Sequence, residues 1–303
     1  MMTSRWHNSH GLGQLTLIVL VALVVTALTS AKHPTIPQTQ TTSVEPDKAT
    51  KARLQGIVNG ILAAWNNVDV VCLGEDHGSK NDSDLRITLI EHPDFVRKVN
   101  AVIVEFADSN HQDILDRLAM DGEDIPREQL RALWKDTSGK VTWESPIYET
   151  FLRAVRKVNL ALPRDKRLRL IAGDNSSERN RGRFIREQVS REILDKHLKA
   201  LGVYGAVHCE NRGMGFPGEI GDKYPGRIWS ASSFYNIDEG RRVFSLGDEP
   251  KLIPITGTEK AKLSVGNMFF LGSYNDPATL ADLFNAIVYY GNVKDIKVPP
   301  DRR

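Results

Sequence analysis

The sequence predicts a three-layer α/β/α protein with a mostly parallel sheet and a loop-rich C-terminal third. Short apolar runs alternate with helical stretches from about residue 51 onward. Most of these helical stretches are ten residues or longer, which is the crossover length that parallel strands require. After residue 208, glycines recur and no helical period appears until about residue 279. The first two observations predict the sheet and its helices, and the third predicts the loops.

In the first two thirds of the chain, the spacing of apolar residues predicts the helices and strands. Apolar residues at helical intervals between 54 and 62 predict a first helix, and the run 68–73 predicts a buried strand. The same alternation then predicts strands at 101–106, 168–172 and 203–208, and helices at 110–120, 126–134, 146–160 and 181–201. In the C-terminal third, the runs 228–235 and 265–271 predict two further strands, and residues 279–290 predict a closing helix. No internal repeat is present, so a solenoid or a propeller is not expected.

The first fifty residues differ from the rest. The apolar run 15–28 has fourteen residues, whereas crossing the hydrocarbon of a bilayer takes about 20. Residues 1–31 are therefore predicted to be a cleaved signal peptide, with an uncleaved N-terminal anchor as the alternative. Residues 32–50 are rich in Pro, Thr and Gln and are predicted to be a polar linker, and residues 51–303 a single domain. The chain is expected to be exported to the periplasm or the cell exterior, or anchored to the membrane by this segment alone.

Composition excludes several classes of protein. With 41% hydrophobic and 26% charged residues, the chain is neither disordered nor a polytopic membrane protein. Forty Lys and Arg against 38 Asp and Glu give a net charge of +2, so no nucleic-acid partner is expected. Cys72 and Cys209 are the only cysteines. They are interpreted either as two small buried hydrophobic residues or, in an exported protein, as a disulfide.

Ionisable residues follow the predicted strands. Glu75 and His77 come after the first strand, Glu105 lies in the second, and His208 ends the fourth. Taken singly, such residues more often form loop hydrogen bonds or helix caps. A charge on a buried strand, however, costs several kcal/mol unless it is paired or binds something. If the first and fourth strands are neighbours, these four residues converge at the carboxyl ends of the strands, where ligands bind in open parallel sheets. Arg86, on the helix after the first strand, is a candidate to hold an anion or an oxyanion.

The other sequence motifs indicate no further functional site. The run GMGFPG at 213–218 matches GxGxxG, but its proline and the glycines that follow do not open a helix, so a dinucleotide site is not expected. The chain has no GxxxxGK[ST], no GxSxG and no HExxH. The simplest NTPase, serine-hydrolase and zincin hypotheses are therefore excluded.

The strand-end residues carry a resemblance to a known superfamily. The order of residues 74–77 (GEDH), Glu105 and residues 205–208 (GAVH) resembles the superfamily of erythromycin esterases, ChaN-like haem-binding proteins, and Tiki and TraB proteins. The segments HQDILDRLAMDGED, LWKDT and VYGAVH look like a bacterial ChaN/erythromycin-esterase-like subgroup. The resemblance covers about half of the chain. It implies a three-layer α/β fold, with hydrolysis, metal-dependent peptide cleavage or haem binding in its different branches.

This chain departs from the esterases in two respects. The esterases place two residues between the Glu and the His, but here only Asp76 separates them, and the chain is short beside an esterase. Macrolide hydrolysis is therefore not expected.

Two functions from different classes remain open at this point. The first is an exported hydrolase of small-molecule esters or of peptides. In it His77 is the general base, Glu75 or Glu105 orients it, and Arg86 and His208 stabilise the oxyanion. In a metal-dependent version, His77, His208 and Glu105 hold a divalent ion with an open position for water.

The second function is binding of haem or another small ligand without catalysis. Tyr204, Tyr224 or Tyr235, or a histidine, would then be the axial ligand. A non-catalytic interaction protein with a decayed site is a third hypothesis, which the complete set of strand-end residues argues against.

Overall fold

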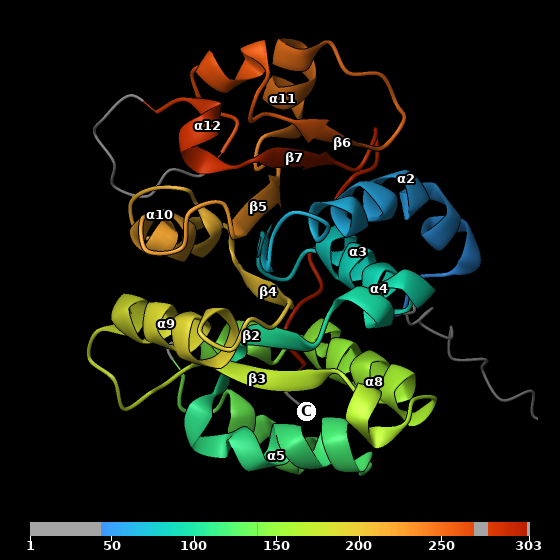
Figure 1. Cartoon of the computed structure of the whole chain (residues 1–303). Coiled ribbons are helices and arrows are strands. Elements are labelled where there is room, and N and C mark those ends of the chain that lie inside the picture. Colours follow the sequence, from blue (N-terminus) through green and yellow to red (C-terminus); the bar gives the residue numbers. More distant parts are fainter. Residues whose placement is uncertain (1–43, 138, 270–277, 302–303) are drawn as a thin grey trace, which may run out of the picture. The chain divides into compact units, whose positions relative to one another are not determined.

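A seven-stranded sheet organises the part of the chain that the computed structural model describes, which is residues 44–137, 139–269 and 278–301 (Figure 1). Its strands are β1 Val70–Glu75, β2 Ala101–Asp108, β3 Arg169–Asp174, β4 Ala200–Gly205, β5 Ile228–Ser233, β6 Lys251–Pro254 and β7 Ala286–Tyr289. They lie in the order β3-β2-β4-β1-β5-β7-β6. All neighbouring pairs are parallel except β6 and β7. The predicted α/β class with a mostly parallel sheet is therefore confirmed.

Helices cover both faces of this sheet. Side chains alternate along β1: Val71 and Leu73 pack on α2 (Lys48–Ala64), α3 (Lys80–Ile90) and α8 (Pro146–Leu160), whereas Val70 and Cys72 belong to the core on the opposite face. That second core includes residues from α9 (Arg181–Val189), α10 (Phe216–Gly221) and α11 (Ile237–Phe244). Two cores separated by one sheet make the three layers.

The remaining helices are short. They are α4 Pro93–Lys98, α5 Gln112–Asp116, α6 Arg127–Leu130, α7 Lys140–Trp143 and α12 Leu280–Leu283. In the part of the chain that the structure describes, five 3-10 helices span Ser109–His111, Arg131–Leu133, Arg164–Lys166, Ala206–Cys209 and Glu259–Lys262, and two π-helical turns span Arg117–Asp121 and Ser190–Leu194. None of the helices in the described ranges is long and apolar enough to cross a membrane.

Local sequence explains where the principal helices begin. Asp47 accepts a hydrogen bond from the backbone N–H of Thr50 at 2.7 Å and so caps α2. The helix thus starts at Lys48, inside the predicted linker, whose residues 32–43 lie outside the described part together with the predicted signal peptide. Helix α8 has the predicted bounds: Pro146 occupies its first turn, and its apolar stripe is buried against the sheet.

Two expectations around β4 were wrong. The predicted helix 181–201 ends earlier, because α9 passes into the π-helical turn, and His197 then takes a left-handed backbone (φ 52°) before the chain enters β4 at Ala200. The predicted strand 203–208 is shifted for the same reason, so that residues 206–209 form a 3-10 helix. Pairing of Leu201 and Val203 with both β1 and β2 sets the position of the strand.

The C-terminal expectations were wrong in part. The predicted helix 279–290 stops after Leu283, because Ile287 and Val288 join the sheet between β5 and β6 as β7. The predicted strand 265–271 is absent from the described residues 265–269, and its last two residues lie outside that part of the chain. The predicted strand 228–235 is β5.

Candidate functional site

A cavity of about 330 Å³ opens at the carboxyl ends of β1, β4 and β5. Strands β1 and β4 are parallel neighbours, as the convergence hypothesis required, and Glu75 pairs with Gly205 at their ends. The cavity is lined by Glu75, Asp76, His77, Gly205, Ala206, Val207, Glu210, Ser232, Ser233, Tyr235, Phe269 and Phe284. Its position is the one at which α/β sheets of this type bind ligands.

His77 and Glu75 lie on the wall of this cavity and are hydrogen-bonded to each other. The His77 Nδ1 lies 2.7 Å from Glu75 Oε1, and the Trp143 ring stands edge-on to the imidazole with the ring centroids 4.6 Å apart. The Nε2 atom forms no hydrogen bond with the described residues, and the side chain is 39% exposed. Burial lowers the pKa of His77 below its usual 6.5, against the opposing fields of Glu105 and Asp76. A neutral imidazole near pH 7 therefore presents Nε2 to a ligand.

Two further side chains hold Glu75 in place. Its Oε2 pairs with the buried guanidinium of Arg86, and its Oε1 accepts a hydrogen bond from the Tyr148 hydroxyl at 2.8 Å. The same hydroxyl accepts from the backbone N–H of Gly78 at 3.1 Å. Arg86 does not line the cavity. Its position suits fixing the Glu75 carboxylate rather than holding the anion or oxyanion that the sequence suggested.

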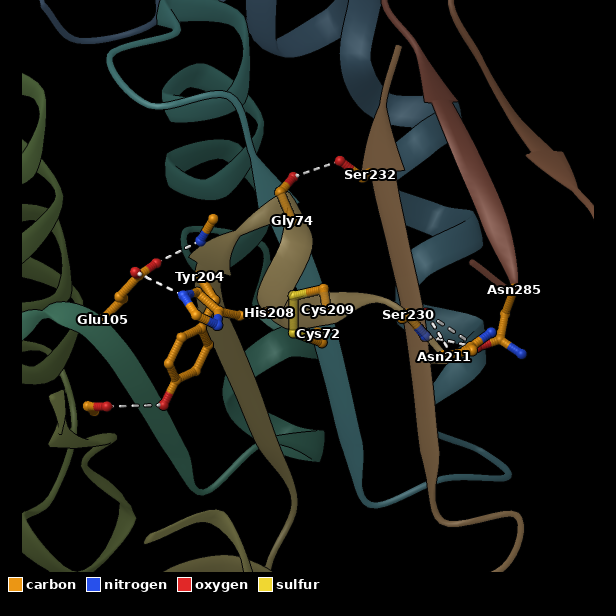
Figure 2. Close-up of a disulfide and its surroundings, with 12 residues drawn as sticks. Cys72, Gly74, Glu105, Tyr204, His208, Cys209, Asn211, Ser230, Ser232 and Asn285 are labelled. Carbon is orange, nitrogen blue, oxygen red and sulfur yellow. Dashed lines mark hydrogen bonds and ion pairs between the residues drawn. A yellow bond between two sulfur atoms is a disulfide. The ribbon is translucent and has the colours of Figure 1, made fainter. Parts of the chain in front are cut away.

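Glu105 forms a second charged centre with Arg181 and His208. Figure 2 shows Glu105 beside His208. Glu105 Oε1 pairs with the Arg181 guanidinium and lies 3.4 Å from His208 Nε2, and Oε2 accepts from the N–H of Gly205. Arg181 also donates to Asp174 Oδ2 at 2.9 Å. Burial alone would raise the pKa of Glu105, but the nearby His208, His77 and Arg181 outweigh it and lower that pKa. Glu105 is therefore an ionised carboxylate.

His208 belongs to this second centre and not to the cavity wall. Its Nε2 faces Glu105 and also Arg181, whose Nη1 is 3.5 Å away. Its Nδ1 is buried and has no hydrogen-bond partner in the described part of the chain. Burial lowers the pKa of His208, with Arg181 adding to the effect and Glu105 opposing it. The sequence correctly places His208 near Glu105, but the structure does not place it beside a ligand in the cavity.

Gly205 allows the two centres to approach one another. A Cβ at this position would lie 2.9 Å from His77 Cε1, 3.0 Å from Nε2 and 3.4 Å from Glu105 Oε2. Any side chain here would displace the imidazole. The glycine of the GxxH pattern is thus required by the close approach of His77.

The arrangement does not form the metal site considered above. Within the described ranges, no three His, Cys, Asp or Glu residues are grouped so as to hold a metal ion. Glu105, the carboxylate assigned to that site, pairs with Arg181, and Glu75 pairs with Arg86. Because an arginine already neutralises each carboxylate, His77, His208 and Glu105 do not fit a divalent ion in this geometry.

Three important residues were not singled out from the sequence. Tyr148 and Arg181 reach the site from α8 and the start of α9, far along the chain from the strands that they contact. Glu210, for which the sequence suggested no role, is buried in the cavity wall. The only local signal for Glu210 was its place two residues after His208.

A disulfide joins the two cysteines (Figure 2). Cys72 lies in the middle of β1, and Cys209 ends the 3-10 helix that follows β4. Of the two interpretations left open by the sequence, the structure has the bridge. The bridge ties the segment with His208 and Glu210 to the strand that ends in Glu75.

Comparisons with known proteins identify no family. No protein-family model matches the chain, and no curated protein matches it. Among solved structures, the chain is similar to ChaN of Campylobacter jejuni, in a structure titled "Cofacial heme binding to ChaN of Campylobacter jejuni". The identity is 16%, the TM-score is 0.40, and the match covers 60% of this chain and 86% of that one. At this TM-score the likeness carries no conclusion about what this chain binds.

Proposed function

We propose that the cavity at the ends of β1, β4 and β5 binds a small, largely apolar molecule that contacts His77. The observation that carries this proposal is the imidazole itself, whose Nδ1 is fixed by Glu75 and whose Nε2 is left for a ligand. The volume of about 330 Å³ is within the range that holds small molecules. Val207, Phe269 and Phe284 supply apolar wall.

Haem is one candidate ligand. His77 Nε2 has the chemistry of an axial ligand, and a carboxylate on the other ring nitrogen raises ligand basicity. Of the three tyrosines considered from the sequence, Tyr204 and Tyr224 are buried and hydrogen-bonded elsewhere, and Tyr235 lines the cavity. His77 and Tyr235 both line the cavity, and we propose His77 as the residue that would hold the iron, because its Nε2 is left for a ligand. The apolar wall would lie against the macrocycle. Bound haem would supply redox or oxygen chemistry set by its axial ligand.

A haem titration tests this candidate. We expect a saturable Soret band with the full chain and its loss in His77→Ala. His111→Ala changes a histidine on the first 3-10 helix, away from the cavity, and should bind as the wild type does. A flat titration with the wild type, or equal binding by His77→Ala, would contradict haem binding at this site.

Hydrolysis is a second candidate, favoured by the Glu75–His77 pair. A neutral imidazole can take a proton from water, and a carboxylate on Nδ1 fixes the tautomer and stabilises the imidazolium that forms. Neither Arg86 nor His208 lines the cavity, so the oxyanion roles assigned to them from the sequence have no support from their positions. The acid–base role rests on His77 alone.

Turnover of 4-nitrophenyl esters tests this candidate. His77→Ala should lower kcat/KM by about 10²–10⁴, the usual contribution of a general base, and His111→Ala should not change it. The wild-type rate should rise with pH and level off below 6.5, because burial lowers the pKa of His77. Hydrolysis that persists in His77→Ala would contradict the assignment.

We also propose that the chain is exported. The disulfide between Cys72 and Cys209 supports this, because such bonds persist in oxidising compartments. N-terminal sequencing of the mature protein from the cell envelope or medium tests the proposal. A start near residue 32 is expected, and an intact protein with reduced cysteines in the cytosol would contradict it.

A further inference from the structure

Glu210 is a buried carboxyl group in the wall of the cavity. The residue is 1% exposed, lines the cavity, and follows Cys209 directly. Its Oε2 is buried and has no hydrogen-bond partner among the described residues. A buried polar atom without a partner costs about 1–3 kcal/mol. A molecule in the cavity could supply the missing partner.

The backbone around Glu210 is held on both sides. The disulfide fixes Cys209 to β1, and the N–H of Asn211 donates to the carbonyl of Leu283 at 2.8 Å. Gly215 packs against the backbone of Glu210 so closely that a Cβ would lie 1.9 Å from its carbonyl oxygen. The backbone from which the Glu210 side chain projects is thus fixed by the fold.

Its surroundings favour the neutral acid. Burial raises the pKa of Glu210 to about 7, opposed only by the field of Arg212. The other titratable groups on the cavity wall are Glu75, Asp76, His77 and Tyr235. Two of these are carboxylic acids, the histidine is neutral near pH 7 and a tyrosine never carries a positive charge, so none of them supplies a positive charge to stabilise an ionised Glu210.

We infer that Glu210, as a carboxylic acid, donates a hydrogen bond to an acceptor oxygen of the ligand in the cavity. The ligand class that fits is an uncharged, largely apolar molecule with a carbonyl group, such as an ester, a ketone or an amide. An anionic group beside Glu210 would add to the acids already present. The inference rests on the proposed function, since it names the chemistry of the molecule that contacts His77.

Binding of the dye Prodan to the full chain tests the inference. Prodan is a neutral aromatic ketone whose emission moves to longer wavelength when its carbonyl accepts a hydrogen bond. At pH 6, Glu210→Met should bind it about three- to tenfold more weakly, as expected for one lost hydrogen bond, and with blue-shifted emission. Glu210→Gln keeps a donor and should stay close to the wild type. Glu178→Gln, an exposed site, is the matched control.

The pH dependence of Prodan affinity distinguishes a hydrogen bond from the protonated Glu210 from the effect of any polar side chain at this position. Wild-type affinity should fall between pH 6 and 8.5 as Glu210 ionises, whereas Glu210→Gln should show no such fall. Equal affinity, emission and pH profile in the wild type and Glu210→Met would overturn the role of Glu210 but leave the cavity as the binding site. Failure of the wild type to bind, or unchanged binding after Val207→Trp fills the cavity, would contradict both proposals.

Discussion

The imidazole of His77 is positioned from one side and open on the other. Glu75 holds Nδ1, and Glu75 is in turn fixed by Arg86 and by the hydroxyl of Tyr148. All three supporting groups are buried, so the low dielectric around them strengthens each contact. At the scale of single residues, the site is a histidine whose orientation is set by a buried carboxylate.

Tyr148→Phe tests this support. The change removes the donor to Glu75 and leaves the N–H of Gly78 without its acceptor, so the free energy of unfolding should fall by about 1–3 kcal/mol. Urea unfolding at pH 7 measures it. Equal stability of Tyr148→Phe and the wild type would show that the hydroxyl does not hold the pair.

The protonation of the two histidines makes a second prediction. Burial lowers the pKa of both His77 and His208 below 6.5. At a pH between these lowered pKa values and 6.5, the unfolded chain binds more protons than the folded chain. The free energy of unfolding therefore rises with pH over this range, and the stability that the two neutral histidines contribute is fully present above pH 6.5. Histidine NMR titration should give pKa values below 6.5 for both His77 and His208, and a value above 6.5 for either would contradict this.

Helix α3 connects the loop that carries His77 to β5 and to the chain after β7. Its residue Asp82 accepts hydrogen bonds from the N–H of Asp76 at 2.9 Å, from Tyr290 of the chain after β7 at 2.7 Å, and from Ser233 of β5 at 3.1 Å. One buried carboxyl group thus joins the loop of His77 to two other elements. At the scale of elements, the first turn of α3 sets where that loop runs.

Asp82→Asn tests this connection through pH. Burial raises the pKa of Asp82 from 3.8 to about 6. Between pH 3.8 and 6 the folded chain therefore holds a proton on Asp82 that the unfolded chain has lost. As the pH rises through this range, the free energy of unfolding of the wild type falls by about 3 kcal/mol, since each pKa unit is worth about 1.4 kcal/mol. Urea unfolding at pH 4 and 7 should show a smaller drop in Asp82→Asn than in the wild type. The exposed Asp165→Asn should keep the wild-type drop, and a full drop in Asp82→Asn would contradict the prediction.

Local sequence signals predicted some elements well and others poorly. Helix α8 has a proline at its start and a continuous apolar stripe, so its bounds could be predicted. Residues 279–290 also have apolar residues at helical spacing, but pairing with β5 and β6 turns 286–289 into a strand. Such pairing depends on partners more than thirty residues away in the sequence, which periodicity does not show.

Some residues of the candidate site could likewise be predicted from the sequence, and others could not. Glu75, His77, Glu105 and His208 could be predicted to approach one another because they lie near the carboxyl ends of parallel strands. Tyr148 and Arg181 could not, because each comes from a helix whose packing fixes its direction. The metal hypothesis failed at this point, since the arginines that neutralise Glu75 and Glu105 were not part of it.

The disulfide acts across most of the domain. It links residues 137 positions apart and holds the segment after β4 against β1. Replacing both cysteines by alanine should therefore lower the free energy of unfolding by roughly 2–5 kcal/mol, since the bridge restricts a long loop in the unfolded chain. Urea unfolding with and without reductant measures it. Reductant should destabilise the wild type and leave the double variant unchanged, and an unresponsive wild type would contradict a stabilising bridge.

The fold brings the Glu75–His77 pair and the apolar side chains of Val207, Phe269 and Phe284 together around one cavity. The most direct test is NMR of the histidine side chains of the ¹⁵N-labelled full chain during a Prodan titration at pH 7. The account predicts a saturable shift of His77 Nε2, with His111 unmoved and the His77 shift abolished by Val207→Trp. Saturable binding that leaves His77 Nε2 unshifted would contradict the claim that this cavity binds its ligand at His77.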